Sequence, residues 1–385
     1  MAAEMTSRER LLATIRHEEP DRVPVAPRIF AWLLEYYGES GLEAHLRAAQ
    51  EFGFDLCHPV GPDTPNYISS LPDEYPLLPE VRATVKRWPE GECTVVARRF
   101  ETPNGVLTDR WRVPPTGRGY GIAPNPVSIE RLIKEPDDLQ RLPYLLPKPA
   151  GGAAGYHDAQ ARIGDRGLAE VTVQGCLDHR AGDARGLANL MVDYHDDRDF
   201  VDRLLDLCHE QAMAEARHAL EHGARIIFGT WYYNSLSVGW SPAMFGELFV
   251  PRIRAHVALA HEYGALYHYY DDGKCAAILD DIRECGVDVF STCTPPPVGD
   301  FDLRVAKRKW RGRVCIKGCI DLLYVIKLGT PERIEQTVRD AIQVGAPGGG
   351  FILGTSDSIR DGTRVENVRA YFEAARKYGA YRPRS

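Results

Sequence analysis

Three polar residues alternate along one extended segment, where they could handle a proton or bind a metal ion. His268, Tyr270 and Asp272 are two residues apart in the stretch ALYHYYDD, so in a strand their side chains share one face. An unpaired buried polar group costs about 1–3 kcal/mol, which makes three of them on a buried strand poor core filler. We expect acid–base or ligand roles, although Asp272 could instead cap the helix that follows it.

Two charged residues stand at the ends of apolar segments. Arg28 follows VPVAP, where an unpaired cation is costly, so it is expected to pair with a carboxylate or with an anionic group of a substrate. Asp357 closes the run GFILGTSD, and its charge would repel a phosphate, which favours proton transfer or hydrogen bonding there. The alternatives are a structural ion pair for Arg28 and a helix cap for Asp357.

Cysteine and aromatic residues supply two further hypotheses. Cys293 and Cys319 end two predicted strands, and with His268 they form a candidate ligand set for a soft metal such as zinc. Taken singly, each cysteine would be a small buried apolar residue. Trp231 and Tyr232 belong to an aromatic loop that could wall a pocket for a flat ligand, unless the loop packs on itself.

The remaining candidates are polar residues at or just after other predicted strand ends. We expect them to contact the substrate, and they are Asp63, Gln174 and Asp321.

Eight short apolar runs alternate with amphipathic helices and would position all of these residues. The predicted strands are 23–30, 55–60, 168–175, 225–232, 265–272, 288–294, 313–321 and 350–358. Runs rich in β-branched and aromatic residues are typical of strands buried on both faces of a parallel sheet. Helices are predicted over 7–16, 199–222 and 331–344, the last with Thr330 as its N-cap and Gly345 at its end.

Eight strands alternating with helices predict an α/β protein, a single (β/α)8 TIM barrel. The carboxyl ends of barrel strands meet at one rim, so we expect the candidate residues to surround one pocket. Residues 64–150 interrupt the alternation between strands 2 and 3, and the Asn104-Gly105 pair predicts a β-hairpin there. We interpret 1–385 as one barrel domain with this hairpin inserted over its mouth.

Composition narrows the class of protein. The 385 residues carry 47 Lys+Arg against 54 Asp+Glu, a formal charge of −7, which disfavours nucleic acid or a membrane as the main partner. Apolar runs stay below the roughly 18 residues of a membrane span, and the first segment is a charged helix. Nine cysteines without disulfide-framework spacing predict free thiols and a cytoplasmic location.

The chain resembles the uroporphyrinogen decarboxylase superfamily, which also contains cobalamin-linked, zinc-dependent methyltransferases. The resemblance is carried by SRERLLATIRHEEPDRVPV, SPAMFGELFVPRIRAHVALAHEYG, DGKCAAILDDIRECGVDVFS, GCIDLLYVIKLGTPERIEQTV and GGFILGTSDSI. It implies a single (β/α)8 barrel with its active cleft at the strand carboxyl ends, and pairing as a homodimer.

Compared position by position, the decarboxylase branch is matched only in part. Those enzymes have an Arg-rich loop after strand 1 that binds substrate carboxylates, and this chain has Arg28 alone there. Their Asp after strand 2 corresponds to Asp63, and their His after strand 8 corresponds to Asp357.

The methyltransferase branch is also matched in part. The resemblance implies a zinc site made of a His-x-Cys pair after strand 5 and a Cys after strand 8, and these positions hold Tyr270, Asp272 and Asp357. A zinc site in this chain would therefore need the rearranged set His268, Cys293 and Cys319.

Taken together, the residues and the resemblance predict a methyltransferase-like enzyme. It would transfer a methyl group between a small organic substrate and a corrinoid or thiol acceptor, with the corrinoid supplied by a partner protein and no organic cofactor of its own. The alternatives are decarboxylation of a carboxylated substrate, tetrapyrroles included, and a non-catalytic ligand-binding barrel.

Overall fold

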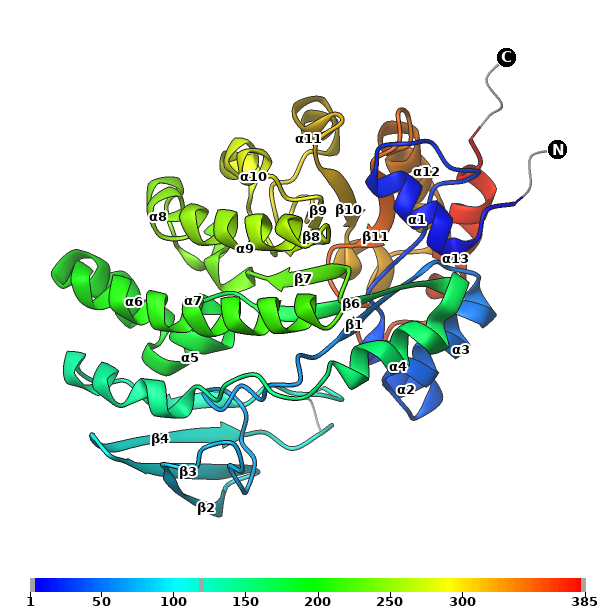
Figure 1. Ribbon diagram of the computed structural model, residues 1–385. Coiled ribbons are helices and arrows are strands. Elements are labelled where there is room, and N and C mark those ends of the chain that lie inside the picture. Colours follow the sequence, from blue (N-terminus) through cyan, green and yellow to red (C-terminus); the bar gives the residue numbers. More distant parts are fainter. Residues whose placement is uncertain (1–3, 118–120, 382–385) are drawn as a thin grey trace. The chain divides into compact units, whose positions relative to one another are not determined.

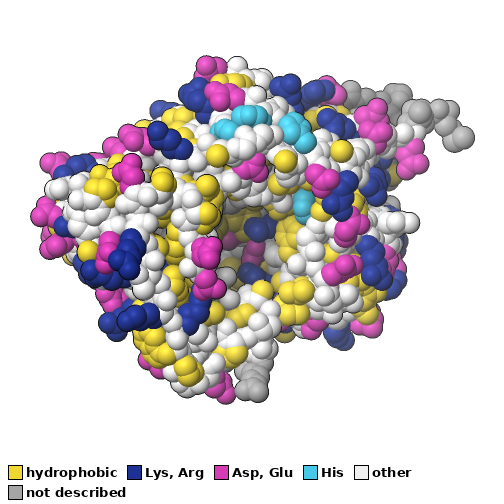
Figure 2. All heavy atoms as spheres, turned by 60° about the horizontal axis from the view of Figure 1, so that its bottom comes forward, with side chains coloured by type: hydrophobic (Ala, Val, Ile, Leu, Met, Phe, Trp, Pro, Cys, Tyr) yellow, Lys and Arg dark blue, Asp and Glu magenta, His cyan; other side chains and the backbone are white. Residues whose placement is uncertain are grey.

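The computed structural model describes residues 4–117 and 121–381, and the chain divides into two compact units (Figure 1). The first unit comprises Met1–Val60, Ala154–Thr172 and Gly223–Ser385, and the second comprises Gly61–Ala153 and Val173–His222. Within the described ranges, no helix is both long and apolar enough to cross a membrane. Figure 2 shows Lys and Arg side chains interspersed with Asp and Glu side chains over one face, as the near balance of charges predicts.

The first unit is built on a curled, seven-stranded parallel sheet in the order β1-β6-β7-β8-β9-β10-β11. Seven of the eight predicted runs overlap its strands. These are β1 Leu56–Val60, β6 Gly167–Gln174, β7 Ile226–Thr230, β8 Leu266–Tyr270, β9 Val289–Ser291, β10 Cys315–Ile320 and β11 Phe351–Thr355. Most of their residues are buried, as expected of strands covered on both faces.

The first predicted strand, 23–30, does not form a full strand, although the segment lies beside the sheet as expected. It makes a single parallel bridge, between Val25 and Leu353 of β11. The Leu353 N–H donates to the Pro24 carbonyl at 2.9 Å, and the Asp55 N–H, just before β1, donates to the Val25 carbonyl at 2.8 Å. Pro24 and Pro27 have no N–H to donate, so a longer ladder cannot form here.

Helices follow most strands of the first unit, and α9 to α12 lie in succession along the outside of β8 to β11 (Figure 1). The helices are α1 Ser7–Ile15, α2 Phe30–Tyr37, α3 Leu42–Phe52, α4 Ala154–Ile163, α8 Pro242–Leu248, α9 Val250–Glu262, α10 Leu279–Cys285, α11 Leu303–Trp310, α12 Pro331–Gly345 and α13 Val365–Tyr378. In α12 the Thr330 hydroxyl accepts a hydrogen bond from the Arg333 N–H at 3.4 Å, which confirms the predicted N-cap.

Helix α1 closes the amino-terminal end of the sheet. Its Leu11 and Ile15 pack in one buried cluster with residues from the beginnings of five strands. The strand members of that cluster are Leu168, Ile226, Val289, Cys315 and Ile352. Because apolar side chains fill this end, the inner space of the sheet is left for polar groups only toward the carboxyl ends of the strands.

The second unit contains a four-stranded antiparallel sheet in the order β2-β3-β4-β5. Its strands are β2 Arg82–Glu90, β3 Cys93–Thr102, β4 Gly105–Val113 and β5 Val127–Glu130, and its helices are α5 Gly182–Arg185, α6 Leu187–Asp196 and α7 Arg198–Glu221. The predicted hairpin is present, with Thr102 paired to Gly105 across the turn. The predicted insertion 64–150 falls in this unit, apart from 118–120, which lie outside the described residues; its position over the barrel mouth stays a prediction.

Candidate active site

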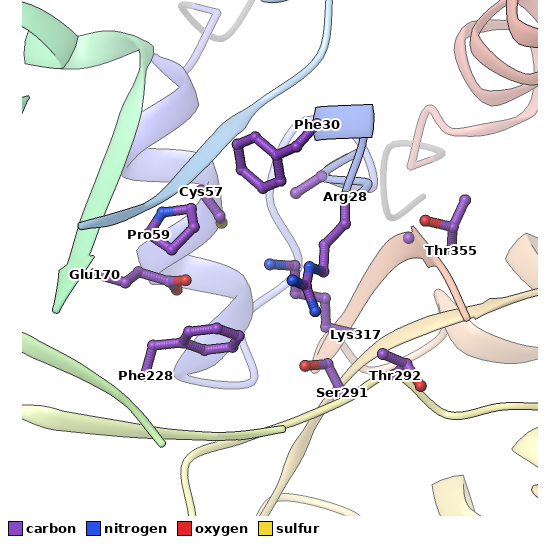
Figure 3. A pocket seen from close by; sticks show the side chains of 12 residues that line it. Arg28, Phe30, Cys57, Pro59, Glu170, Phe228, Ser291, Thr292, Lys317 and Thr355 are labelled. Atoms are coloured by element: carbon purple, nitrogen blue, oxygen red, sulfur yellow. The ribbon is translucent and has the colours of Figure 1, made fainter. Parts of the chain in front are cut away.

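A cavity lies on the inner side of the parallel sheet in the first unit (Figure 3). The polar side chains that line it are Arg28, Glu170, Ser291, Thr292, Lys317 and Thr355. The apolar part of the lining comes from Phe30, Cys57, Pro59 and Phe228. A few polar groups on a largely apolar wall are what a site for a small organic ligand requires.

Beside this cavity, two carboxyl groups share one tyrosine hydroxyl. The Tyr270 hydroxyl is 3.0 Å from Asp357 Oδ1 and 3.3 Å from Asp272 Oδ2. The Thr292 hydroxyl, on the next strand, donates to Asp272 Oδ1 at 3.1 Å. The four residues come from the ends of β8, β9 and β11, which adjoin the same rim of the sheet.

The environment of Asp272 suits a group that exchanges protons near neutral pH. Burial and the neighbouring negative charge of Asp357 raise the pKa of Asp272 to about 7, against the opposing effects of Arg28 and of the Thr292 and Tyr270 hydroxyls. A carboxyl with this pKa is present in both protonation states at pH 7, as an acid–base catalyst requires. It is not a helix cap, because the next helical turn is preceded by Cys275.

Arg28 joins the carboxyl pair to the cavity. Its guanidinium lies 3.6 Å from Asp357 Oδ1, and its central carbon is 4.5 Å from the centre of the Tyr270 ring, within cation–π distance. The side chain also lines the cavity, and its Nε is buried without a hydrogen-bond partner in the described part of the chain. Arg28 therefore makes the expected carboxylate pair and keeps donor capacity toward an anionic ligand.

Tyr232 and Trp231, both predicted to line the pocket, lie in different environments. The Tyr232 ring packs edge-on to the Tyr270 ring, with centroids 6.1 Å apart, and so stands beside the carboxyl pair. Trp231 is fully buried, packs against His256 of α9, and donates its indole N–H to the Tyr267 hydroxyl at 2.8 Å. The expectation that Trp231 walls the pocket is wrong, because its side chain fills the layer between sheet and helix.

Three further side chains, from β6, β8 and β9, are connected by hydrogen bonds. His268 Nδ1 is 3.1 Å from Glu170 Oε1, and His268 Nε2 is 2.7 Å from Ser291 Oγ. Burial would raise the pKa of Glu170, but His268 and Lys317 lower it to about 2. Burial lowers the pKa of His268 below its ordinary 6.5, against the opposing effect of Glu170. At neutral pH these three side chains are thus a carboxylate (Glu170), a neutral imidazole (His268) and a hydroxyl (Ser291).

Glu170, Ser291 and Lys317 were not predicted as site residues. The predicted residues stand at or after strand ends, whereas Glu170 and Lys317 lie inside β6 and β10. A usable signal was present in the sequence, because a single charge inside an otherwise apolar strand, as in LAEVTV and CIKGCI, is costly unless it serves a site.

The predicted zinc set is not assembled. Both ring nitrogens of His268 are engaged by Glu170 and Ser291, while the Cys293 thiol donates to the Phe290 carbonyl at 3.5 Å. Burial and a hydrogen bond with the Cys319 thiol raise the pKa of Cys293, which opposes the thiolate form that zinc needs. Across residues 4–117 and 121–381, no three His, Cys, Asp or Glu side chains are grouped to hold a metal ion. These residues do not fit zinc.

Three further residues, Asp321, Gln174 and Asp63, were also predicted to contact the substrate. Asp321 caps the helical turn Leu322–Lys327 by accepting the Tyr324 N–H, which explains its position at the end of β10. Gln174 and Asp63 belong to the second unit, where the Gln174 side chain accepts a hydrogen bond from Asn66 at 2.6 Å and Asp63 is exposed. Their roles in substrate binding stay predictions.

The parallel α/β sheet and its cavity define a class of fold that carries many small-molecule enzymes. The chain belongs to the uroporphyrinogen decarboxylase (URO-D) family, whose model matches residues 180–378, more than half of the sequence.

Comparison with individual proteins gives two reaction types. A methylated-thiol--coenzyme M methyltransferase from Methanosarcina mazei is 26% identical over 197 residues, 51% of this chain and 50% of that relative, so the match spans about half of its length. A uroporphyrinogen decarboxylase from Magnetococcus marinus is 25% identical over 295 residues, 73% of each chain. The solved structure of a methyltransferase from Methanosarcina mazei superimposes with a TM-score of 0.64 at 17% identity, covering 97% of this chain and 99% of that one, a likeness of fold.

Proposed function

We propose that this chain is a URO-D family enzyme that decarboxylates a small organic acid held by Arg28 and protonates the product from Asp272. The observation that supports this best is the carboxyl pair Asp272 and Asp357, bridged by the Tyr270 hydroxyl, with the pKa of Asp272 at about 7. An anchoring cation beside a carboxyl that is half-protonated at neutral pH is the combination that such a reaction needs.

The proposed steps use side chains of the first unit. One carboxylate of the substrate binds the Arg28 guanidinium. The carbon–carbon bond to a second carboxylate breaks to release CO2, leaving its electron pair on the substrate carbon. Protonated Asp272 gives its proton to that carbon, while Tyr270 and Thr292 hold the resulting carboxylate. A proton from solvent restores Asp272. The Phe30 and Phe228 side chains in the cavity wall exclude water, which favours loss of a charged group as neutral CO2.

The test is release of CO2 from a panel of small carboxylic acids in heavy water. The expected product carries one deuterium on the carbon that lost CO2. Asp272→Asn should slow release by roughly 10²–10⁴-fold, the usual contribution of a general acid. Asp288→Asn, a carboxyl just before β9 at the amino-terminal end of the sheet, is the matched control. An Asp272→Asn variant as fast as the wild type would refute the proposal, and binding of an acid without turnover would favour the ligand-binding alternative.

Methyl transfer is the second candidate, and the relative from Methanosarcina mazei supports it. Asp272 would then protonate the heteroatom that loses its methyl group, and a corrinoid protein or a thiol would accept the methyl. Since the His268, Cys293 and Cys319 set does not fit zinc, the role of this chain would be binding and proton donation. The distinguishing result is a demethylated product, formed without CO2 only when a corrinoid protein or a thiol is added.

Three structural and cellular expectations accompany the proposal. We infer that the segment around Val25 completes the sheet as the eighth strand of a (β/α)8 barrel, because it bonds to β11 on one side and to Asp55 before β1 on the other. A homodimer and a cytoplasmic location are proposed from the family resemblance and the nine free cysteines. Sedimentation and cell fractionation test these two proposals.

A further inference from the structure

The hydrogen-bonded side chains of Glu170, His268 and Ser291 have no part in the proton transfer proposed above. They join three neighbouring regions of the sheet, β6, β8 and β9, with contacts of 3.1 Å and 2.7 Å on the two sides of the imidazole. All three side chains are nearly fully buried. Two of them, Glu170 and Ser291, also line the cavity, as Figure 3 shows. A hydroxyl that is bonded to a buried base and open to a ligand site is placed as a nucleophile is.

The protonation states fix the direction of both hydrogen bonds. Glu170, whose pKa is lowered to about 2, is a carboxylate at neutral pH and can only accept, so His268 Nδ1 must carry the proton. Burial keeps the imidazole neutral, which leaves Nε2 as an acceptor. The Ser291 hydroxyl therefore donates to Nε2. This is the tautomer in which a histidine can remove the proton of a serine.

The environment of Ser291 also provides a charge for the oxygen that an attack would make negative. Ile316 of β10 pairs with Phe290 of β9 in parallel register, so the next residues, Lys317 and Ser291, lie side by side. Both line the cavity, into which the Lys317 side chain extends (Figure 3). The Phe228 ring packs on His268 with centroids 4.7 Å apart and limits the water around the imidazole. A cation in a water-poor site stabilises a developing oxyanion strongly.

We propose that Ser291, His268 and Glu170 form a nucleophilic triad, and that Ser291 takes the acyl group of small esters or thioesters that bear a carboxylate. Ser291 Oγ bonds to the carbonyl carbon as its proton passes to His268 Nε2. The bond to the leaving alcohol or thiol then breaks, and the leaving group takes that proton. Water attacks the acyl-serine while giving a proton to His268, and Ser291 regains this proton as the carboxylic acid leaves.

The preference for a carboxylate follows from Arg28, whose guanidinium lines the same cavity as Ser291. The Phe30, Pro59 and Phe228 side chains crowd the same cavity and restrict the acyl group to a short chain. This inference goes beyond the proposed decarboxylation and shares with it only the anion-binding role of Arg28.

The first test is covalent labelling of the full chain with diisopropyl fluorophosphate, read by intact mass and peptide mapping. We expect one label, on Ser291, and none in Ser291→Ala. Ser358→Ala removes a similarly buried serine whose hydroxyl has no hydrogen-bond partner in the described part of the chain, and it should be labelled as the wild type is. Labelling should rise with pH through the pKa of His268, below 6.5, and stay level above it. A wild-type chain without label on Ser291 would overturn the triad.

The second test compares hydrolysis of mono-4-nitrophenyl succinate with that of neutral 4-nitrophenyl butyrate, which has a chain of similar length. We expect the succinate ester to be preferred, and Arg28→Gln to remove the preference. Glu170→Gln should slow hydrolysis and labelling by roughly 10²–10⁴-fold, because the histidine loses its fixed tautomer. Hydrolysis by Ser291→Ala at the wild-type rate overturns the proposal, provided that circular dichroism shows the variant folded.

The two proposals can fail separately. Asp272→Asn should slow CO2 release strongly and still be labelled on Ser291. Absence of CO2 with intact labelling would remove the proposed decarboxylation alone, and CO2 release without labelling would remove the triad alone.

Discussion

The raised pKa of Asp272 makes a prediction about stability as well as about catalysis. Burial and the charge of Asp357 raise this pKa from 3.8 to about 7, so the native chain binds the Asp272 proton more tightly than the unfolded chain does. Stability therefore falls as pH rises from about 4 to 7, and the full cost, an upper bound of roughly 4 kcal/mol, is present above pH 7. Asp272→Asn removes the charge and leaves a side chain of the same size, which can still meet the Tyr270 and Thr292 hydroxyls.

The expected result is a stability gain that grows with pH. Relative to the wild type, Asp272→Asn should become more stable by roughly 2–3 kcal/mol between pH 5 and pH 8, whatever constant change in packing the substitution brings. Urea unfolding of both proteins at pH 5, 6, 7 and 8 measures this increment. Thr292→Val is a control in which the stability difference from the wild type should change with pH in the opposite direction. Losing the Thr292 hydrogen bond raises the pKa of Asp272, so the fall in stability extends to higher pH. A stability difference that does not change with pH would refute the reasoning.

Three further substitutions test the architecture around the site. In the second unit, buried Arg98 is paired with Asp109, so Arg98→Met should leave an uncompensated charge and cost about 3–5 kcal/mol of unfolding free energy in urea. Leu11→Ala opens a cavity in the apolar cluster under the sheet and should cost about 2–5 kcal/mol, with little change in the catalytic pH profile if α1 acts only as a structural plug. Trp231→Phe loses the hydrogen bond to the Tyr267 hydroxyl and should lower the melting temperature, while affinity for a carboxylic acid ligand, measured by calorimetry, stays the same.

Residue type and strand order predicted much of the fold and the cluster of polar residues at the strand ends. Seven of the eight predicted apolar runs overlap parallel strands, because burial on both faces requires apolar residues there. Residues at the ends of such strands adjoin one rim, which is why Arg28, Tyr270, Asp272 and Asp357 meet as expected. The first strand was overestimated because its two prolines weigh more on hydrogen bonding than its apolar character does on packing.

The hydrogen bonds among Glu170, His268 and Ser291 could not be predicted from the sequence, because they depend on contacts across the sheet. Glu170, His268 and Ser291 are far apart in sequence, and only the parallel register brings them within hydrogen-bonding distance. The same contacts occupy both ring nitrogens of His268, so neither is free for the predicted zinc set. Trp231 shows the complementary difficulty: an aromatic residue at a strand end suits a pocket or a core equally, and orientation decides between them.

The apolar packing of α1 has a consequence for how ligands enter and leave the cavity. Because Leu11 and Ile15 fill the amino-terminal end of the sheet, the cavity that Arg28 lines is closed at that end of the first unit. Whatever leaves it must travel back along the path by which the next molecule arrives. Product that lingers at the Arg28 side chain would thus block new substrate, and inhibition by product should be competitive.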